Sequence, residues 1–403
     1  MKKNLLRGDY LFTIITKLVI VLVSFINTII INRYLGPELR GYYSYILNIC
    51  NILILILNLG IGQSYVFYKK NSVNEVKSLF ITLSLFQFIL YFFILFTIKI
   101  FTNNEAYNYI AIVTIFGIIN NQILFIALIE NVKTRNKINL ISNFIYTAIL
   151  LFVYFFSNSN ISLIVYSLGI RYFVEVILCF KYFNMYNNLR FKALNKNIII
   201  EILKFGSVQM IISVLITFNY NIDVIIMKKF LGYADIGIYS LGVTLANMLW
   251  IIPDAFKDVL FNKSARKNSI NTICKSISIN IVVSLIITTV FIFIGREFIE
   301  LFYGKEFLNA YKVSIILFLG TIPMIFFKLI TPLYTSIGKQ RRMLIVLILS
   351  NISNIVANFM LIPELGIIGA AISSVASYSL CGLIFLFYFI RENKVKLNYF
   401  KII

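Results

Sequence analysis

Long apolar segments, separated by short polar ones, fill most of this chain. About twelve of them come close to the roughly 20 apolar residues that a helix needs to span a bilayer. They lie near residues 11–31, 43–66, 79–99, 108–129, 138–157, 161–180, 203–227, 238–253, 276–295, 311–335, 343–362 and 366–390. Runs such as Ile52–Leu57 do not alternate between apolar and polar residues, as the strands of a membrane barrel do. The pattern therefore predicts an all-α integral membrane protein.

The two halves of the chain repeat one passage at an offset of 196 residues. Identical residues at this offset are Leu35/Leu231, Gly36/Gly232, Gly41/Gly237, Tyr43/Tyr239 and Ser44/Ser240. The following helix keeps the register with the polar pairs Asn48/Thr244, Asn51/Asn247 and Asn58/Asp254. Because the offset holds six predicted spans, an even number, the second copy starts in the orientation of the first, which predicts two parallel six-helix repeats.

This duplication predicts three parts of the chain. An N-terminal six-helix bundle covers residues 1–180, a basic and Asn-rich cytoplasmic linker covers 181–202, and a C-terminal six-helix bundle covers 203–403. Internal duplication is the usual construction of membrane transporters, in which one repeat rocks against the other to alternate access to a central site.

Composition and charge support the membrane assignment and define a topology. The chain is 60% hydrophobic and 13% charged, with a mean hydropathy of +0.89. A net charge of +21 is also found in nucleic-acid-binding proteins, but 25 of the 37 Lys and Arg residues fall in segments that are cytoplasmic when the N-terminus is inside. Only eight fall on the opposite side. This bias is typical of the positive-inside rule and predicts that both termini are cytoplasmic, with no nucleic-acid partner.

Catalytic and metal-binding signals are lacking in the sequence. It contains no histidine, and its four cysteines have neither metal-site nor disulfide spacing. No nucleotide-binding, metalloprotease or hydrolase motif is found. We expect a transporter rather than an enzyme, without catalytic residues, metal or cofactor, and with H⁺ or Na⁺ coupling left open.

Several motifs lie at the repeated passages and near the C-terminal end. They are Leu35-Gly36-Pro37-Glu38, Gly41-Tyr42-Tyr43, Asn58-Leu59-Gly60-Ile61-Gly62, Asp223, Leu231-Gly232, Gly237-Ile238-Tyr239-Ser240, Gly338-Lys339-Gln340-Arg341, and Asn354 to Gly369 with Asn358, Pro363 and Gly366. Together they resemble the polysaccharide-biosynthesis flippases, which include the Wzx-type O-antigen and capsule repeat-unit flippases of the MATE-like MOP superfamily.

The resemblance implies a function and a location. A protein of this kind moves an undecaprenyl-diphosphate-linked oligosaccharide from the cytoplasmic to the outer leaflet of the cell inner (plasma) membrane. The lipid bilayer surrounds it, and the polysaccharide polymerase and the chain-length regulator are its candidate protein partners.

A diphosphate-bearing substrate requires cations within the membrane, where an insertion cost of about 2.5–3.5 kcal/mol makes each one a functional candidate. Lys328 is the first candidate, because Pro323 and Pro332 bracket it and permit kinks. Three threonines share its face: Thr321, Thr331 and Thr335. The alternative is that its ammonium satisfies backbone carbonyls that the prolines free.

Two further cations are substrate-binding candidates. Lys17 belongs to a polar stripe on the first helix, and the alternative is that it extends to the cytoplasmic interface. Arg171 lies one turn before Glu175, so these two residues either line a cavity or neutralise each other as an i, i+4 pair.

Two carboxylates are candidates for ion coupling, Asp223 and Glu175. Asp223 occupies the repeat position of Asn27, and the resemblance implies an acidic residue at this place. Either it binds a proton or Na⁺, or it pairs with an outer cation, for which Lys228, Lys229 and Arg33 are at hand.

The matched polar stripes on the second helix of each half add Asn51 and Asn247 as substrate-binding candidates. Such stripes also hold helices together, and both interpretations stay open.

Three other classes of protein were weighed. A MATE-like ion-coupled multidrug or small-molecule exporter shares the expected fold but needs acidic residues for cationic drugs. A membrane glycosyltransferase or polymerase needs a large loop with catalytic carboxylates or arginines, which this sequence lacks. A membrane scaffold without transport leaves Lys328 unexplained.

The predicted topology is open to cysteine labelling. An impermeant thiol reagent added to intact cells should modify an Asn104→Cys protein and leave an Asn188→Cys protein unmodified. Lysing the cells should make Asn188→Cys reactive, which controls for access. The reverse pattern would overturn the orientation.

Overall fold

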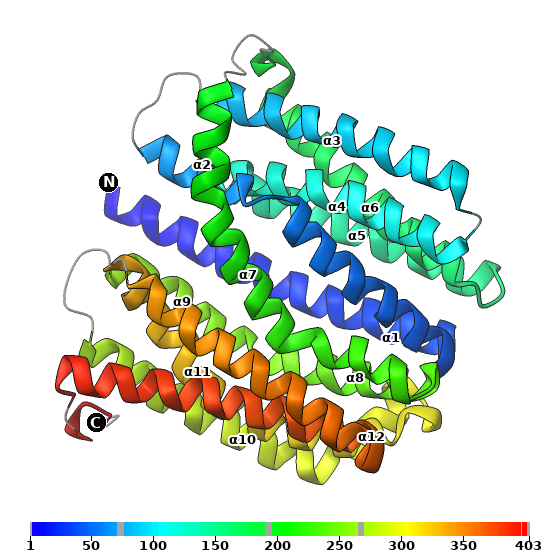
Figure 1. Cartoon of the computed structure of the whole chain (residues 1–403), viewed down its shortest axis with the longest axis vertical. Helices are drawn as coiled ribbons and strands as arrows, with labels where there is room; N and C mark the ends of the chain where they lie inside the picture. Colours follow the sequence, from blue (N-terminus) through cyan, green and yellow to red (C-terminus); the bar gives the residue numbers. More distant parts are fainter. Residues whose placement is uncertain are drawn as a thin grey trace. The chain divides into compact units, whose positions relative to one another are not determined.

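The computed structural model describes residues 2–70, 76–102, 104–189, 196–264, 270–337, 339–395 and 397–400, and this part of the chain is helical (Figure 1). Its α-helices are α1 (Lys2–Leu57), α2 (Ile61–Lys70), α3 (Val76–Phe101), α4 (Glu105–Glu130), α5 (Val132–Phe156), α6 (Ile161–Tyr182), α7 (Lys196–Phe230), α8 (Tyr233–Leu249), α9 (Ile251–Ser264), α10 (Ile270–Tyr303), α11 (Ala310–Ser336) and α12 (Gln340–Asn393). Three 3-10 helices are η1 (Met185–Asn188), η3 (Lys305–Phe307) and η4 (Leu397–Phe400).

Ten helical segments of this described part are long and apolar enough to cross a membrane, so the chain is a multi-pass integral membrane protein. The predicted all-α membrane class is confirmed. Two of the helices, α1 with 56 residues and α12 with 54, are too long for one crossing. Straight helices of this length would extend about 80 Å, against a hydrocarbon core of about 30 Å.

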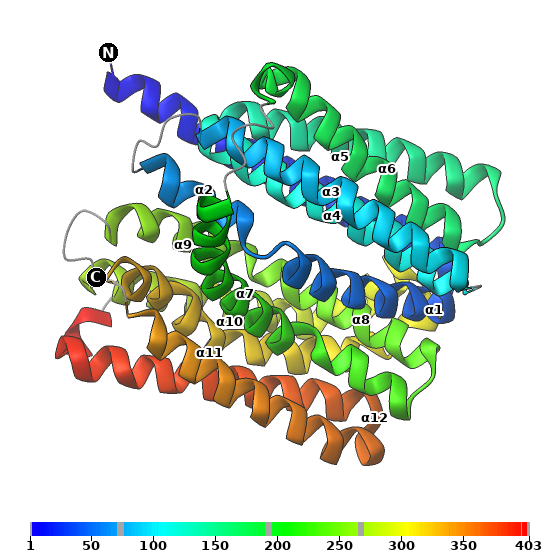
Figure 2. The same ribbon diagram turned by 45° about the horizontal axis from the view of Figure 1, so that its top comes forward.

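Each of these two helices contains one glycine at which the backbone leaves the helical conformation. Gly36 in α1 has φ 64°, and Gly366 in α12 has φ 57°. Only glycine adopts positive φ at little steric cost. At these glycines both helices double back, and their two arms run antiparallel (Figures 1 and 2).

The second apolar helix of the first repeat is interrupted, so the predicted span over 43–66 is wrong, whereas the span predicted over 238–253 lies within one candidate crossing, Tyr233–Lys257. In the first repeat α1 ends at Leu57, Leu59 and Gly60 take positive φ (54° and 68°), and α2 begins at Ile61. In the second repeat α8 ends at Leu249 and α9 begins at Ile251. Apolar periodicity did not predict the break after Leu57 because both sides of it are apolar.

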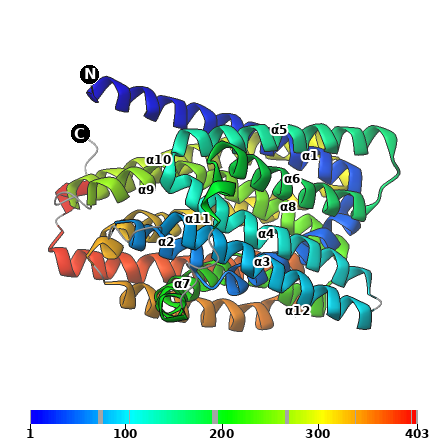
Figure 3. The same ribbon diagram turned by 90° about the horizontal axis from the view of Figure 1, so that it is seen from above.

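The chain forms two compact units. Unit 1 comprises Met1–Leu35 and Ile46–Val214, and unit 2 comprises Gly36–Tyr45 and Leu215–Ile403. Helix α7 therefore contributes residues to both units, and it begins at Lys196, within the range expected to be linker. In unit 1 the helices α3, α4, α5 and α6 lie side by side along a common direction (Figure 3).

Asparagine caps start three consecutive helices of unit 1. The side-chain oxygens of Asn104, Asn131 and Asn160 accept hydrogen bonds from backbone N–H groups in the first turns of α4, α5 and α6, at 2.9, 3.1 and 2.8 Å. A helix terminus has N–H groups without an intrahelical partner, and asparagine is among the best residues for satisfying one. These caps define where the helices begin.

The two copies of the repeated passage meet within unit 2. A Cβ atom added to Gly41 would lie 1.7 Å from the carbonyl oxygen of Tyr233, and one added to Gly237 would lie 2.0 Å from that of Pro37. Because Pro37 and Tyr233, like Gly41 and Gly237, are related by the 196-residue offset, the contact is reciprocal. Both positions therefore need glycine for close backbone approach, which explains two of the identities between the copies.

This contact predicts different effects for two glycines of one motif. Gly237→Ala should destabilise the protein by about 1–3 kcal/mol or more, because the added methyl group overlaps backbone atoms that cannot rotate away. Gly232→Ala is the matched control, since Gly232 has φ −74° and nothing lies within 4 Å of its added Cβ. Thermal unfolding of the purified proteins in detergent measures both. Equal stability of Gly237→Ala and Gly232→Ala would contradict the reciprocal contact.

Candidate functional site

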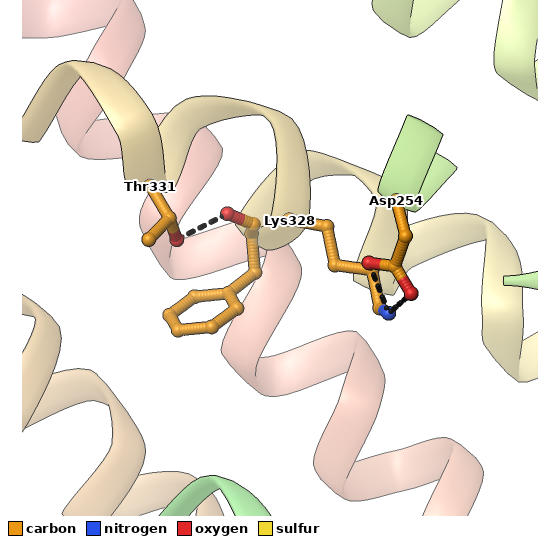
Figure 4. Close-up of polar contacts among 4 residues, drawn as sticks. Asp254, Lys328 and Thr331 are labelled. Carbon is orange, nitrogen blue, oxygen red and sulfur yellow. Dashed lines mark hydrogen bonds and ion pairs between the residues drawn. The ribbon is translucent and has the colours of Figure 1, made fainter. Parts of the chain in front are cut away.

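Lys328 of α11 and Asp254 of α9 point toward each other in unit 2 (Figure 4). The lysine Nζ lies 2.8 Å from Oδ1 and 2.9 Å from Oδ2 of the aspartate. The Lys328 side chain is 9% exposed, whereas that of Asp254 is 48% exposed. A buried cation needs an anionic or polar partner, because its desolvation is otherwise uncompensated. The pair therefore keeps a lysine charged at a depth where water is scarce.

Two aromatic side chains of unit 2 face this lysine, and a third packs on both of them. Its Nζ lies 4.6 Å from the centroid of the Trp250 ring and 5.9 Å from that of Tyr220. Tyr378 packs on both rings, at centroid distances of 5.6 Å from Trp250 and 5.7 Å from Tyr220. Aromatic faces attract cations, more strongly where water is excluded. The buried Nε1 of Trp250, a hydrogen-bond donor, has no acceptor among the described residues.

Helix α11 continues through Pro323 and Pro332 as one helix. Pro332 has no N–H to donate to the carbonyl of Lys328, four residues earlier. The ammonium nevertheless donates to Asp254, so the interpretation in which Lys328 satisfies a freed carbonyl is wrong. Thr331 donates to the carbonyl of Phe327 at 2.6 Å (Figure 4). Of the other two threonines on this face, Thr321 donates to the Phe318 carbonyl, and Thr335 to the sulfur of Met343.

The Lys328–Asp254 pair was missed by sequence reasoning, although both residues stood out separately. The repeat offset pairs Asp254 with a neutral residue, Asn58, and pairs Lys328 with Val132. When one copy of a repeat has an acidic and a basic residue at two positions that are neutral in the other copy, this difference indicates that the two charges interact. That signal was present in the sequence.

Asp223 on α7 forms a second buried cluster in unit 2. Its Oδ2 accepts hydrogen bonds from the hydroxyls of Tyr239 and Ser374, the latter at 2.9 Å. Its Oδ1 accepts from the N–H of Val224 at 3.2 Å. Lys228 instead places its ammonium 3.7 Å from the centre of the Tyr233 ring. The interpretation of Asp223 as the partner of an outer cation is therefore wrong.

Glu175 on α6 is a buried carboxylate in unit 1 that is also held by uncharged donors. Oε2 accepts from Asn120 at 2.9 Å, and Oε1 accepts from Asn139 at 2.9 Å and from Ser142 at 3.1 Å. Of the two alternatives for Arg171 and Glu175, the ion pair does not form. The guanidinium of Arg171 instead lies 5.6 Å from the Tyr146 ring centre, with its Nε buried and without a hydrogen-bond partner.

The matched polar stripes separate into exposed and buried members. Asn51 and Asn247 are both exposed in the structure. Asn58 is buried in unit 1, where it donates to Asn121 at 2.8 Å and accepts from Gln122 at 2.6 Å. The stripe thus provides helix packing at Asn58 and open positions at Asn51 and Asn247.

Lys17 lies on α1, but its side chain is outside the described residues, so its role in substrate binding stays a prediction.

The two clusters of unit 2 are adjacent along two helices. Tyr220 and Asp223 are three residues apart on α7, and Ser374 and Tyr378 are four apart on α12. Residues at these spacings lie on the same helix face. A change of charge at Asp223 therefore has a direct structural route to the aromatic rings around Lys328.

Two protein-family models match this chain. Residues 6–254 match the family described as polysaccharide biosynthesis protein, and residues 259–402 match that described as lipid II flippase MurJ. No curated protein matches the sequence.

Solved structures share the fold at low sequence identity. The chain is similar to the inward closed conformation of the lipid II flippase MurJ, with 14% identity, a TM-score of 0.75, and coverage of 97% of this chain and 89% of that one. It is also similar to an inward-facing multidrug resistance MATE transporter of the MOP superfamily, with 12% identity, a TM-score of 0.68, and coverage of 94% and 98%. The chain is also similar to the eukaryotic MATE transporter AtDTX14, with 13% identity, a TM-score of 0.60, and coverage of 96% of both chains.

The fold is therefore that of the MurJ and MATE structures. Together with the family match over residues 6–254, it confirms the expectation of a transporter rather than an enzyme. The match over residues 6–254 covers more than half of the chain. This chain belongs to the polysaccharide biosynthesis protein family.

Proposed function

We propose that this protein is a flippase that carries an undecaprenyl-diphosphate-linked oligosaccharide, an O-antigen or capsule repeat unit, from the cytoplasmic to the outer leaflet. The family match and the similarity to a lipid II flippase support a lipid-linked substrate. The single observation that carries the proposal is the buried ammonium of Lys328 inside an apolar helix.

The chemistry of Lys328 fits the constant part of every such substrate. The diphosphate is present whatever sugar is attached, and it requires a cation in a place that a lipid can reach. A lysine surrounded by low-dielectric protein acts on an anion more strongly than one in water does. Lys17, Arg171, Asn51 and Asn247 are proposed to assist along the path, the first two toward phosphate and the amides toward sugar hydroxyls.

The transport cycle is proposed to follow the alternating access of duplicated transporters. Counting the two arms of α1 and of α12 separately supports twelve crossings in two parallel six-helix repeats. An even number of crossings puts both termini on one side of the membrane, and the excess of Lys and Arg there favours the cytoplasmic side. The protein is proposed to reside in the cell inner (plasma) membrane. A polysaccharide polymerase and a chain-length regulator are proposed as its partners.

Asp223 and Glu175 are proposed as sites of H⁺ or Na⁺ coupling. Both are buried carboxylates whose described hydrogen-bond donors are uncharged, although Arg135 also interacts electrostatically with Glu175. Ionisable groups inside a membrane domain are typical of ion pathways. Asp223 is placed first, because α7 and α12 connect it to the cluster around Lys328.

An ion-coupled exporter of small cationic molecules, like the MATE transporters, is the second candidate. The same two carboxylates favour it, because a cationic drug needs a buried anion. The two functions separate in proteoliposomes: the flippase moves a lipid diphosphate and ignores a cationic dye, and the exporter does the opposite.

Replacing Lys328 should stop transport without unfolding the protein. Lys328→Ala should reduce flipping of a fluorescent lipid-linked oligosaccharide by about tenfold or more, since losing one charged hydrogen bond costs about 1.5–3 kcal/mol. Lys328→Arg keeps the charge and should retain part of the rate. Loss of the lysine should not unfold the protein, because the Asp254 side chain that it leaves unpaired is 48% exposed. Lys312→Ala, an exposed lysine of the same helix, is the matched control and should flip normally. Wild-type flipping by Lys328→Ala would refute the site.

Replacing Asp223 should uncouple transport from its ion gradient. In proteoliposomes with an imposed pH or Na⁺ gradient, wild-type flipping should accelerate, while Asp223→Asn should flip at one rate with and without the gradient. The amide keeps the shape of the carboxylate but cannot bind a proton or Na⁺ with a charge. Asp235→Asn, in the first turn of α8, serves as control and should stay gradient-dependent. A gradient response that survives Asp223→Asn would exclude this carboxylate as the coupling site.

A further inference from the structure

We infer that Asp254 occupies the place of the substrate's phosphate, so that substrate binds by displacing this carboxylate from Lys328. The inference rests on the proposed function and deepens it, because it assigns to Asp254 a role in how the empty and the loaded protein differ.

The two members of the pair differ in their need for each other. Lys328 is 9% exposed and would lose its only carboxylate partner among the described residues if Asp254 left. Asp254 is 48% exposed and has room to turn away from Lys328. Breaking such a pair is costly for the buried charge and cheap for the half-exposed one. The site therefore demands an anion at Lys328, but it does not demand that this anion be Asp254.

The surroundings offer more positive than negative charge to an anion at this place. Lys257, one turn beyond Asp254 on α9, also interacts electrostatically with Lys328. Asp254 lies in the first turn of α9, and its own N–H donates to the carbonyl of Trp250 at 2.9 Å. The buried Nε1–H of Trp250 has no described acceptor. One carboxylate leaves part of this attraction unused, whereas a diphosphate carries at least two negative charges.

The first repeat lacks this arrangement, which argues against a purely structural role. Its counterpart of Asp254 is Asn58, which is buried and engaged with the amides of Asn121 and Gln122. That network contains no charged side chain. A neutral amide is therefore sufficient for the fold at this position of the repeat, and the charged pair of unit 2, with its half-exposed aspartate, is available for another task.

Exchange of anions lets the protein complete the transport cycle both empty and loaded. In the empty protein Asp254 neutralises Lys328, so the protein returns without a bare buried charge. In the loaded protein the diphosphate pairs with the ammonium of Lys328, and the Asp254 side chain turns away from it. At the outer leaflet, return of the carboxylate to Lys328 competes with the phosphate and promotes its release.

Binding of undecaprenyl diphosphate to the purified full-length protein in nanodiscs tests the inference. Asp254→Asn removes the competing charge but keeps an oxygen that accepts from the ammonium, so the protein should remain folded. It should bind the lipid about tenfold more tightly than the wild type, a change of about 1.4 kcal/mol. It should also flip more slowly at saturating lipid, because release is impaired. Asp235→Asn should match the wild type in both measurements.

The outcomes separate this inference from the proposed function. Tighter binding and slower flipping by Asp254→Asn support the exchange, since a merely structural aspartate would not raise affinity when removed. Unchanged or weaker binding, with the wild type still bound in a Lys328-dependent way, overturns the exchange and leaves the flippase intact. Binding that is insensitive to Lys328→Ala overturns the flippase site and this inference together. Thermal unfolding of each variant, compared with wild type, excludes loss of fold as the cause.

Discussion

A hydrocarbon layer offers no hydrogen-bond partners, and this single constraint accounts for most of the architecture. Every backbone N–H and C=O group at membrane depth must be satisfied within the protein, which is why the described chain is helical. The same constraint acts on side chains. Asp223, Glu175 and Asn58 are buried only because two or three protein donors or acceptors meet each of them.

Backbone breaks are therefore placed where special residues make them cheap. Gly36 and Gly366 adopt positive φ and allow α1 and α12 to double back. Elsewhere glycine permits close approach instead, as at the reciprocal contact of Gly41 with Gly237, or where a Cβ on Gly382 would lie 1.8 Å from the carbonyl oxygen of Pro323. Dispersion between closely packed backbones replaces the hydrophobic driving force that lipid cannot supply.

The two halves of the chain repeat one passage in sequence but differ in chemistry. Around the break in the second helix, unit 1 has a neutral amide network and unit 2 has an ion pair among aromatic rings. A duplicated sequence supplies two related halves, and a charged site in one half is enough when the protein needs only one such site. The buried carboxylate of unit 1, Glu175, shows that the two halves hold different ionisable groups.

The sequence by itself determined the membrane class, the duplication and the family motifs, because apolar length, repeat offset and glycine positions are local properties of the chain. It also singled out Lys328, Asp223 and Glu175, since a charge inside an apolar run is visible without a fold. Only the tertiary structure decided their partners. Lys328 and Asp254 are 74 residues apart, and Asp223 and Ser374 are 151 apart. Such contacts depend on which helices pack together and on which of their faces meet, and no local sequence pattern specifies either.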